Sequence, residues 1–276
     1  MKCVVGNTEF HYETVGEGKP IVLFHGWRSD HRIMMDIAEP VLADRDGWLR
    51  IYPDLPGMGE TSGAGITNQD QVLDLLLGFI DSVTGGRRCV VGGFSYGGYL
   101  ALGTAYKYSD RIDGLLLIAP AGLPGGGVSP RLPVHTTLVS DPGLFEGLDK
   151  ETAEHFRELA VVQNRELLDA VANLAGPARI LADEEYLSWL DEHWPFTFEE
   201  ECLRATCAAP TLVVTGRQDA VTGYADAFEL MQNFPRGTYA ALDGGGHALV
   251  WEQRTVFDAL FDEWIDRIER QTSPTR

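Results

Sequence analysis

Short apolar runs alternate with longer amphipathic stretches along most of the chain, and this alternation predicts the order of its elements. Residues 2–15 alternate in steps of two around Gly6-Asn7, as a β-hairpin does. Apolar runs typical of strands follow near 20–25, 48–53, 87–94 and 112–119. Stretches with helical spacing separate them near 33–44, 68–83 and 96–108. Strands that alternate with helices predict a parallel sheet with right-handed crossovers.

The pattern changes after Pro120. Residues 121–133 are rich in glycine and proline and predict an irregular, hinge-like stretch. From about 141 to 206 the sequence has helical patterning and no convincing strand. We therefore expect a helical insertion over 121–207 that is not an independent domain.

The sheet pattern then returns in the last part of the chain. Residues 210–215 and 238–242 have the β-branched and apolar composition of strands. An apolar stripe over 254–269 predicts a terminal helix that packs on the sheet. Residues 1–120 and 208–276 are therefore expected to form one α/β core, with the helical insertion after its sixth strand.

The most informative motif is Gly93-Phe94-Ser95-Tyr96-Gly97, because a predicted strand precedes it and a predicted helix follows it. A serine in G-x-S-x-G on a strand-to-helix turn is typical of a nucleophile elbow. The turn is so tight that side chains two residues before and after the serine would collide, and glycine at both positions avoids this. The hydroxyl of Ser95 is then held at the carboxyl edge of the sheet, ahead of a helix N-terminus.

A serine hydroxyl needs a base to take its proton, and the base needs an acid to orient it. Asp219 directly follows the predicted strand at 210–215, and His247 follows the strand at 238–242 after three glycines. Both residues thus fall on loops past the ends of consecutive strands, where a parallel sheet presents side chains to a ligand. The order serine, acid, histidine matches that of an α/β-hydrolase.

On these motifs the chain resembles the α/β-hydrolase superfamily over nearly its whole length. Four further segments carry the resemblance: a strand and "HG" loop, a D-x-x-G-x-G-x-S loop, an acid loop and a histidine loop. They are Ile21–Trp27, Asp54–Ser62, Gly216–Asp219 and Gly246-His247 with Glu252. The resemblance implies a mostly parallel eight-stranded sheet flanked by helices, with a helical cap inserted after strand 6.

The resemblance also implies a role for each catalytic residue. Ser95 is the expected nucleophile, His247 the general base and then acid, and Asp219 the orienting acid. Asp243 precedes the glycine run and is better explained as a turn residue. Some relatives place the acid after the sixth strand, but that loop reads Ala119-Pro120-Ala121-Gly122 and has no carboxylate.

An oxyanion hole needs two donors aimed at the tetrahedral oxygen. The backbone N–H of Tyr96 follows the nucleophile and is one expected donor. The family pattern places the other at the N–H of Trp27, after His25-Gly26. His25 is expected to support this loop by hydrogen bonding.

The composition of the chain limits which binding partners and which cellular compartment are expected. The formal net charge of -19 argues against nucleic acid or an anionic membrane surface as a partner. The N-terminus lacks the apolar core of a signal peptide and no run of 18 apolar residues occurs, which favours a cytoplasmic protein. The four cysteines have no metal-ligand spacing, so we expect no metal, no disulfide and no cofactor. Whether the chain forms a homo-oligomer stays open.

The substrate is less well defined by the sequence. Arg28 follows the oxyanion loop, and Trp189, Trp194 and Phe196 are aromatic residues of the insertion that could line a mainly apolar pocket. A small, fairly apolar carboxylic ester is the expected substrate. C–C bond hydrolases of vinylogous diketones share the serine, the acid and the histidine, and thioesterases, lactonases, perhydrolases and nitrile-type lyases also remain alternatives. A ligand-binding receptor on a hydrolase fold is the non-enzymatic alternative.

Overall fold

A computed structural model describes residues 1–122 and 131–272. Its main sheet has eight strands in the order β1-β2-β4-β3-β5-β6-β9-β10. The pairs β1–β2 and β2–β4 are antiparallel, and the other neighbours are parallel, so the predicted hairpin and parallel sheet are confirmed. The strands are β1 Lys2–Val5, β2 Thr8–Val15, β3 Lys19–Phe24, β4 Trp48–Pro53, β5 Cys89–Phe94, β6 Ile112–Ile118, β9 Thr211–Gly216 and β10 Gly237–Leu242.

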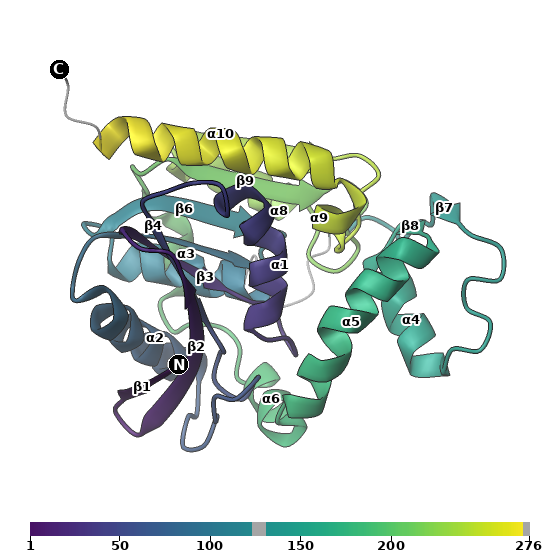
Figure 1. The fold of residues 1–276 in the computed structure, drawn as a ribbon, viewed down its shortest axis with the longest axis horizontal. Coiled ribbons are helices and arrows are strands. Elements are labelled where there is room, and N and C mark those ends of the chain that lie inside the picture. The colour runs from purple at the N-terminus through teal and green to yellow at the C-terminus, as the bar shows by residue number, and fades with distance from the viewer. Residues whose placement is uncertain (123–130, 273–276) are drawn as a thin grey trace.

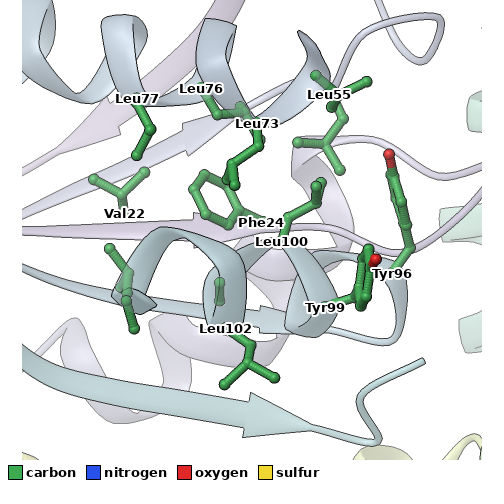
Figure 2. Close-up of a cluster of buried hydrophobic side chains, with 14 of the residues drawn as sticks. Val22, Phe24, Leu55, Leu73, Leu76, Leu77, Tyr96, Tyr99, Leu100 and Leu102 are labelled. Atoms are coloured by element: carbon green, nitrogen blue, oxygen red, sulfur yellow. The ribbon is translucent and has the colours of Figure 1, made fainter. Parts of the chain in front are cut away.

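Alternate side chains of the central strands enter two separate cores. In β3, Val22 and Phe24 point to one face of the sheet, whereas Ile21 and Leu23 point to the other. Figure 2 shows the first of these cores, where leucines of the helix at Gln69–Thr84 pack over Val22 and Phe24. Because the parallel strands are covered on both faces, they are apolar throughout rather than alternating.

Helices cover both faces of the sheet. The helices α2 and α3 contribute to the core around Phe24, and α1 and α10 contribute to the opposite core. Figure 1 shows α10 lying along β9 at one face. The helices of the sheet-bearing part are α1 His31–Leu42, α2 Gln69–Thr84, α3 Tyr96–Lys107, α8 Ala225–Glu229, η1 Leu230–Asn233, α9 Leu249–Glu252 and α10 Arg254–Thr272.

The segment between β6 and β9 is mainly helical. It holds α4 Lys150–Leu159, α5 Arg165–Leu181, α6 Glu184–Asp191 and α7 Glu199–Arg204. Figure 1 shows α4, α5 and α6 on the side of the molecule toward which the arrows of the parallel strands point. The structure therefore places these helices beside the edge at which Ser95 lies. Residues 123–130 of the predicted hinge-like stretch lie outside the described residues.

A short strand at 162–163 contradicts the expectation of no strand over 141–206, and it pairs with another short strand just before that range. These strands, β7 Val139–Ser140 and β8 Val162–Gln163, pair in parallel as a separate two-stranded sheet. Two residues are too few to produce a periodic pattern, so strands of this length cannot be predicted from hydrophobic periodicity. Among the helices that the structure describes, none has both the length and the apolar character to cross a membrane.

Candidate active site

The turn between β5 and α3 holds Ser95 in a strained backbone conformation. Its φ is 54°, in the left-handed region that side chains rarely adopt. A Cβ atom on Gly93 would lie 2.2 Å from the carbonyl carbon of Gly97, and one on Gly97 would lie 2.1 Å from the carbonyl oxygen of Phe24. Only glycine fits at both positions, so these two residues allow the turn to present Ser95.

Three side chains from different loops meet at this turn. The Ser95 Oγ atom lies 3.1 Å from His247 Nε2, and His247 Nδ1 lies 2.9 Å from Asp219 Oδ2. All three residues are buried, and Asp219 is fully so. Asp219 follows β9 and His247 follows β10. The two residues meet because the carboxyl ends of these adjacent parallel strands lie at the same edge of the sheet. The Phe94 ring packs against the imidazole of His247 at 5.0 Å between centroids.

Thr222 donates hydrogen bonds to the buried carboxylate of Asp219. Its hydroxyl donates to Asp219 Oδ2 at 2.8 Å, and the backbone N–H groups of Val221 and Thr222 donate to Oδ1. Burial opposes ionisation of Asp219, but the neighbouring His247 and the bonds from Thr222 outweigh it and lower the pKa of this carboxyl. The carboxylate is therefore ionised at neutral pH and can accept a hydrogen bond from His247 Nδ1.

Trp27 and Tyr96, whose backbone N–H groups are the expected oxyanion donors, both lie near Ser95. Tyr96 begins α3, so its N–H lies at the helix N-terminus, where the helix dipole favours an anion. Trp27 lies on the loop after β3, and its ring packs edge to face with that of Tyr96, with the centroids 4.8 Å apart. Within residues 1–122 and 131–272, neither amide is among the donors to backbone carbonyls outside the helices and strands.

Asp54 and Leu55 hold both ends of the loop that carries Trp27. At the entrance, His25 Nδ1 donates to the Gly26 carbonyl at 2.8 Å, and its Nε2 accepts from the Leu55 N–H at 2.9 Å. At the exit, Asp54 Oδ1 accepts from the N–H of His31 at 2.9 Å. Burial lowers the pKa of the His25 ring, so the imidazole is neutral and can accept and donate in this way.

A cavity of about 240 Å³ opens beside Ser95 and His247. Its floor comes from the sheet-bearing part of the chain, including the loop at Gly26–Ser29. Its roof comes from one face of α5 and one face of α4. The roof residues are spaced three and four apart, as neighbours on one helical face are: His155 and Leu159 on α4, and Val171, Leu174, Ala175 and Arg179 on α5.

The sequence profile described as the alpha/beta hydrolase family matches residues 21–260, which is most of the chain. The chain belongs to the alpha/beta hydrolase family. The fold and the site geometry described above agree with this membership, and the resemblance noted in the sequence is confirmed.

Relatives of this hydrolase include proteins named as oxo-dienedioate hydrolases and as methyl ester esterases. A 2-hydroxy-6-oxononadienedioate/2-hydroxy-6-oxononatrienedioate hydrolase of Burkholderia vietnamiensis is 27% identical over 93% of this chain and 91% of its own length. A pimeloyl-[acyl-carrier protein] methyl ester esterase of Nitrosomonas europaea is 26% identical over 91% of this chain and 98% of its own. Both relatives are hydrolases, and the protein described here is a hydrolase of the same family.

Solved structures of other hydrolases superpose on most of this chain. An alpha/beta superfamily hydrolase from Oenococcus oeni superposes with a TM-score of 0.88 and 28% identity, over 98% of this chain and 99% of that one. A thermophilic esterase from Thermogutta terrifontis superposes with a TM-score of 0.70 and 25% identity, over 95% of this chain and 94% of that one.

The cavity of this hydrolase differs from the expected aromatic pocket. Arg28 lines it, as expected, but Trp189, Trp194 and Phe196 are not among its lining residues. Phe196 stacks on Tyr99 at 4.2 Å between centroids, and Trp194 stacks on the same ring at 4.8 Å. Trp189 stacks instead on His193 near the surface. The first two aromatic rings join the insertion to α3 and are used in packing, which is why they do not line the cavity.

Two functional positions of this hydrolase carried little signal in the sequence. Thr222 follows Asp219 by three residues, and only a turn after the acid loop could have suggested it. Glu252 was noted only as part of the histidine loop. Its carboxylate accepts from the N–H groups of Gly246, Val161 and Val162 at 2.6, 2.6 and 2.9 Å. It therefore joins the insertion to the loop that carries His247.

One group of described residues could hold a metal ion. His11, His31 and Asp54 offer ligand atoms that lie within 4.8 Å of one another. In the structure, the Nδ1 atoms of both histidines instead bond the Asp54 carboxylate, at 2.9 and 2.8 Å. The group therefore satisfies its own polar atoms and supports the loop after β3.

Replacing Asp54 with asparagine is expected to lower the free energy of unfolding by about 3 kcal/mol at pH 7, because buried donors lose a charged acceptor. Burial alone would raise the pKa of Asp54, but the bonds from His31 and Glu60 hold it well below its usual value. The stabilisation is therefore present above the unfolded pKa of about 3.9 and is lost as the pH falls toward the folded pKa. Urea unfolding at pH 7 and pH 3 should show the difference from wild type shrinking in acid.

The matched control for this prediction is Asp44→Asn, which removes the same charge from an exposed position. It should change the free energy of unfolding by less than about 0.5 kcal/mol. Equal effects of the two substitutions would contradict a special role for Asp54.

Proposed function

We propose that this hydrolase is a serine esterase that cleaves a small, largely apolar carboxylic ester through an acyl-enzyme on Ser95. The observation that carries the proposal is the chain of contacts from Ser95 Oγ to His247 Nε2 at 3.1 Å and from His247 Nδ1 to Asp219 at 2.9 Å. These contacts lie at the end of a cavity lined largely by aliphatic and aromatic side chains. The insertion over 121–207 acts in this proposal as the cap that forms the cavity roof.

In the first half-reaction, Ser95 Oγ attacks the ester carbonyl carbon while His247 Nε2 takes the hydroxyl proton. The negative charge that develops on the carbonyl oxygen is stabilised by the N–H groups of Trp27 and Tyr96. Asp219 stabilises the positive charge on the imidazole. When the tetrahedral intermediate collapses, His247 gives its proton to the departing alcohol, and the acyl group remains on Ser95.

In the second half-reaction, water takes the place of the alcohol. His247 takes a proton from the water as its oxygen attacks the acyl carbon, and the same two N–H groups stabilise the second intermediate. Collapse returns the proton to Ser95 Oγ and releases the carboxylic acid. Because the site is buried, each of these contacts acts in a medium of lower polarity than bulk water.

C–C bond hydrolysis is the second candidate, since the Burkholderia vietnamiensis relative carries the name of such an activity. A panel of methyl esters, thioesters, lactones and vinylogous 1,5-diketones, with products identified by mass spectrometry, separates the two. The proposal expects an acid and an alcohol from esters, at a kcat/KM at least tenfold above that for any diketone. Faster release of an acid and an enol from a diketone would replace ester hydrolysis with the second candidate.

A further inference from the structure

The cavity beside Ser95 is more basic than the rest of the protein. The chain has 41 acidic and 22 basic side chains, with a formal net charge of -19. Among the described residues that line the cavity, however, there are Arg28, Arg179 and His155 besides the triad histidine, and there is no aspartate or glutamate. Such a reversal of sign in a cavity of an acidic protein favours an anionic ligand there.

Arg28 occupies a position where an arginine is not required by the fold. Its φ is 53°, in the left-handed region, and only Ser95 and Ala119 share this property among the non-glycine residues that the structure describes. Glycine or asparagine would adopt this conformation with less strain. Strained residues of this kind cluster at ligand sites, and Arg28 lies one residue after the expected oxyanion donor Trp27.

Both arginines retain donors that could hold a ligand. Arg28 pairs with Glu184 at 2.8 Å, and Arg179 pairs with Glu151. The side chains of Glu184 and Glu151 are 53% and 77% exposed, so both pairs lie at the solvent side and are weakened by water. A guanidinium has five N–H donors, and neither arginine has another partner among the described residues.

His155 lies in the same basic surroundings. Burial lowers the pKa of its imidazole, and Arg179, His247 and Arg28 lower it further, against the opposing effect of Glu158. His155 lines the same cavity as Arg28, Arg179 and His247. A neutral imidazole can still donate one N–H to an anion.

We propose that the ester cleaved at Ser95 carries a carboxylate, which Arg28 of the floor and Arg179 of the roof bind together while the ester carbonyl lies at the nucleophile. This inference rests on the proposed esterase function and narrows its substrate to monoanionic esters. The apolar side chains that line the same cavity would then contact the carbon chain that joins the two ends of the substrate.

The test compares matched esters that differ only in charge. Monomethyl esters of straight-chain dicarboxylic acids from succinate to suberate are assayed beside methyl alkanoates of equal carbon number. Acetate esters of ω-hydroxy acids beside alkyl acetates test a carboxylate on the alcohol side. At least one anionic ester should exceed its neutral partner about tenfold or more in kcat/KM, as expected of charge-assisted hydrogen bonds.

Four variants assign the effect to the arginines. Arg28→Gln and Arg179→Gln should each lower kcat/KM for the anionic ester about tenfold, mainly by raising KM, and change the neutral ester less than about twofold. Glu184→Gln and Glu151→Gln, the matched controls, remove the exposed partners and should leave or improve the anionic preference. If the arginine variants lower both esters equally, the arginines have only a structural role and the inference is wrong.

The remaining outcomes separate this inference from the proposed function. Hydrolysis of neutral and anionic esters at equal kcat/KM would overturn the anionic substrate and leave the esterase proposal standing. If no ester is cleaved, the esterase proposal fails, and binding alone is measured with adipate as the probe by thermal shift. Adipate that stabilises the wild type but not Arg28→Gln would support the anion site. Adipate without effect on either would overturn it.

Discussion

Replacing Ser95 with alanine is expected to reduce kcat for ester hydrolysis by about 10⁴- to 10⁶-fold, because the acyl-enzyme can no longer form. The residual rate comes from the oxyanion donors and from binding. The fold should be retained, since among the described residues the Ser95 hydroxyl has one side-chain hydrogen bond, to His247 at 3.1 Å. Steady-state kinetics measures the loss, and circular dichroism with thermal unfolding verifies the fold.

Ser82→Ala is the matched control for this change. Ser82 is an exposed serine of α2 whose hydroxyl donates to the Gly78 carbonyl at 2.9 Å. Its replacement should leave kcat within twofold of wild type. If Ser95→Ala retained more than about a tenth of the wild-type kcat, a covalent role for Ser95 would be untenable.

Replacing Asp219 with asparagine is expected to reduce kcat by about 10⁴-fold while binding of substrate changes little. The carboxylate accepts from His247 Nδ1 at 2.9 Å, which leaves His247 Nε2 free to accept the serine proton. An amide nitrogen at that place would favour the tautomer with its proton on Nε2, and that tautomer cannot act as the base. Steady-state kinetics across pH 5 to 9 measures kcat and KM separately.

The neighbouring carboxylate provides the control for Asp219. Asp243 is exposed and accepts from Gln218 Nε2 at 2.7 Å, and it lies four residues before His247. Asp243→Asn should leave kcat within about twofold. If Asp243→Asn lost more kcat than Asp219→Asn, Asp243 rather than Asp219 would be the acid that orients His247.

The sequence allowed the sheet and the three meeting side chains to be predicted because both depend on local signals. The strand Cys89–Phe94 is an apolar run that ends in G-x-S-x-G, and this turn has few alternative conformations. Asp219 and His247 each follow a strand, so the parallel sheet brings them to one edge although 28 residues separate them. Contacts between neighbouring parallel strands follow from strand order alone.

The cavity lining could not be predicted in the same way. Leu174 and Phe196 both belong to helical or apolar stretches, and hydrophobicity does not distinguish a side chain that packs from one that faces a cavity. The contact between Phe196 and Tyr99 joins residues 97 positions apart and depends on how the insertion folds back over α3. Arg179 could not be predicted as a lining residue for the same reason, because only the position of α5 brings it to the cavity that Ser95 lines.

The most direct test of an activated Ser95 is intact-mass analysis after reaction with a small alkyl fluorophosphonate, which phosphonylates an activated serine. We expect one adduct per chain on the wild-type protein, located on the peptide that contains Ser95 and absent from Ser95→Ala. The adduct should form far more slowly in His247→Ala, because the base that removes the Ser95 proton is missing. An unmodified wild-type protein, or an adduct that persists in Ser95→Ala, would contradict the account.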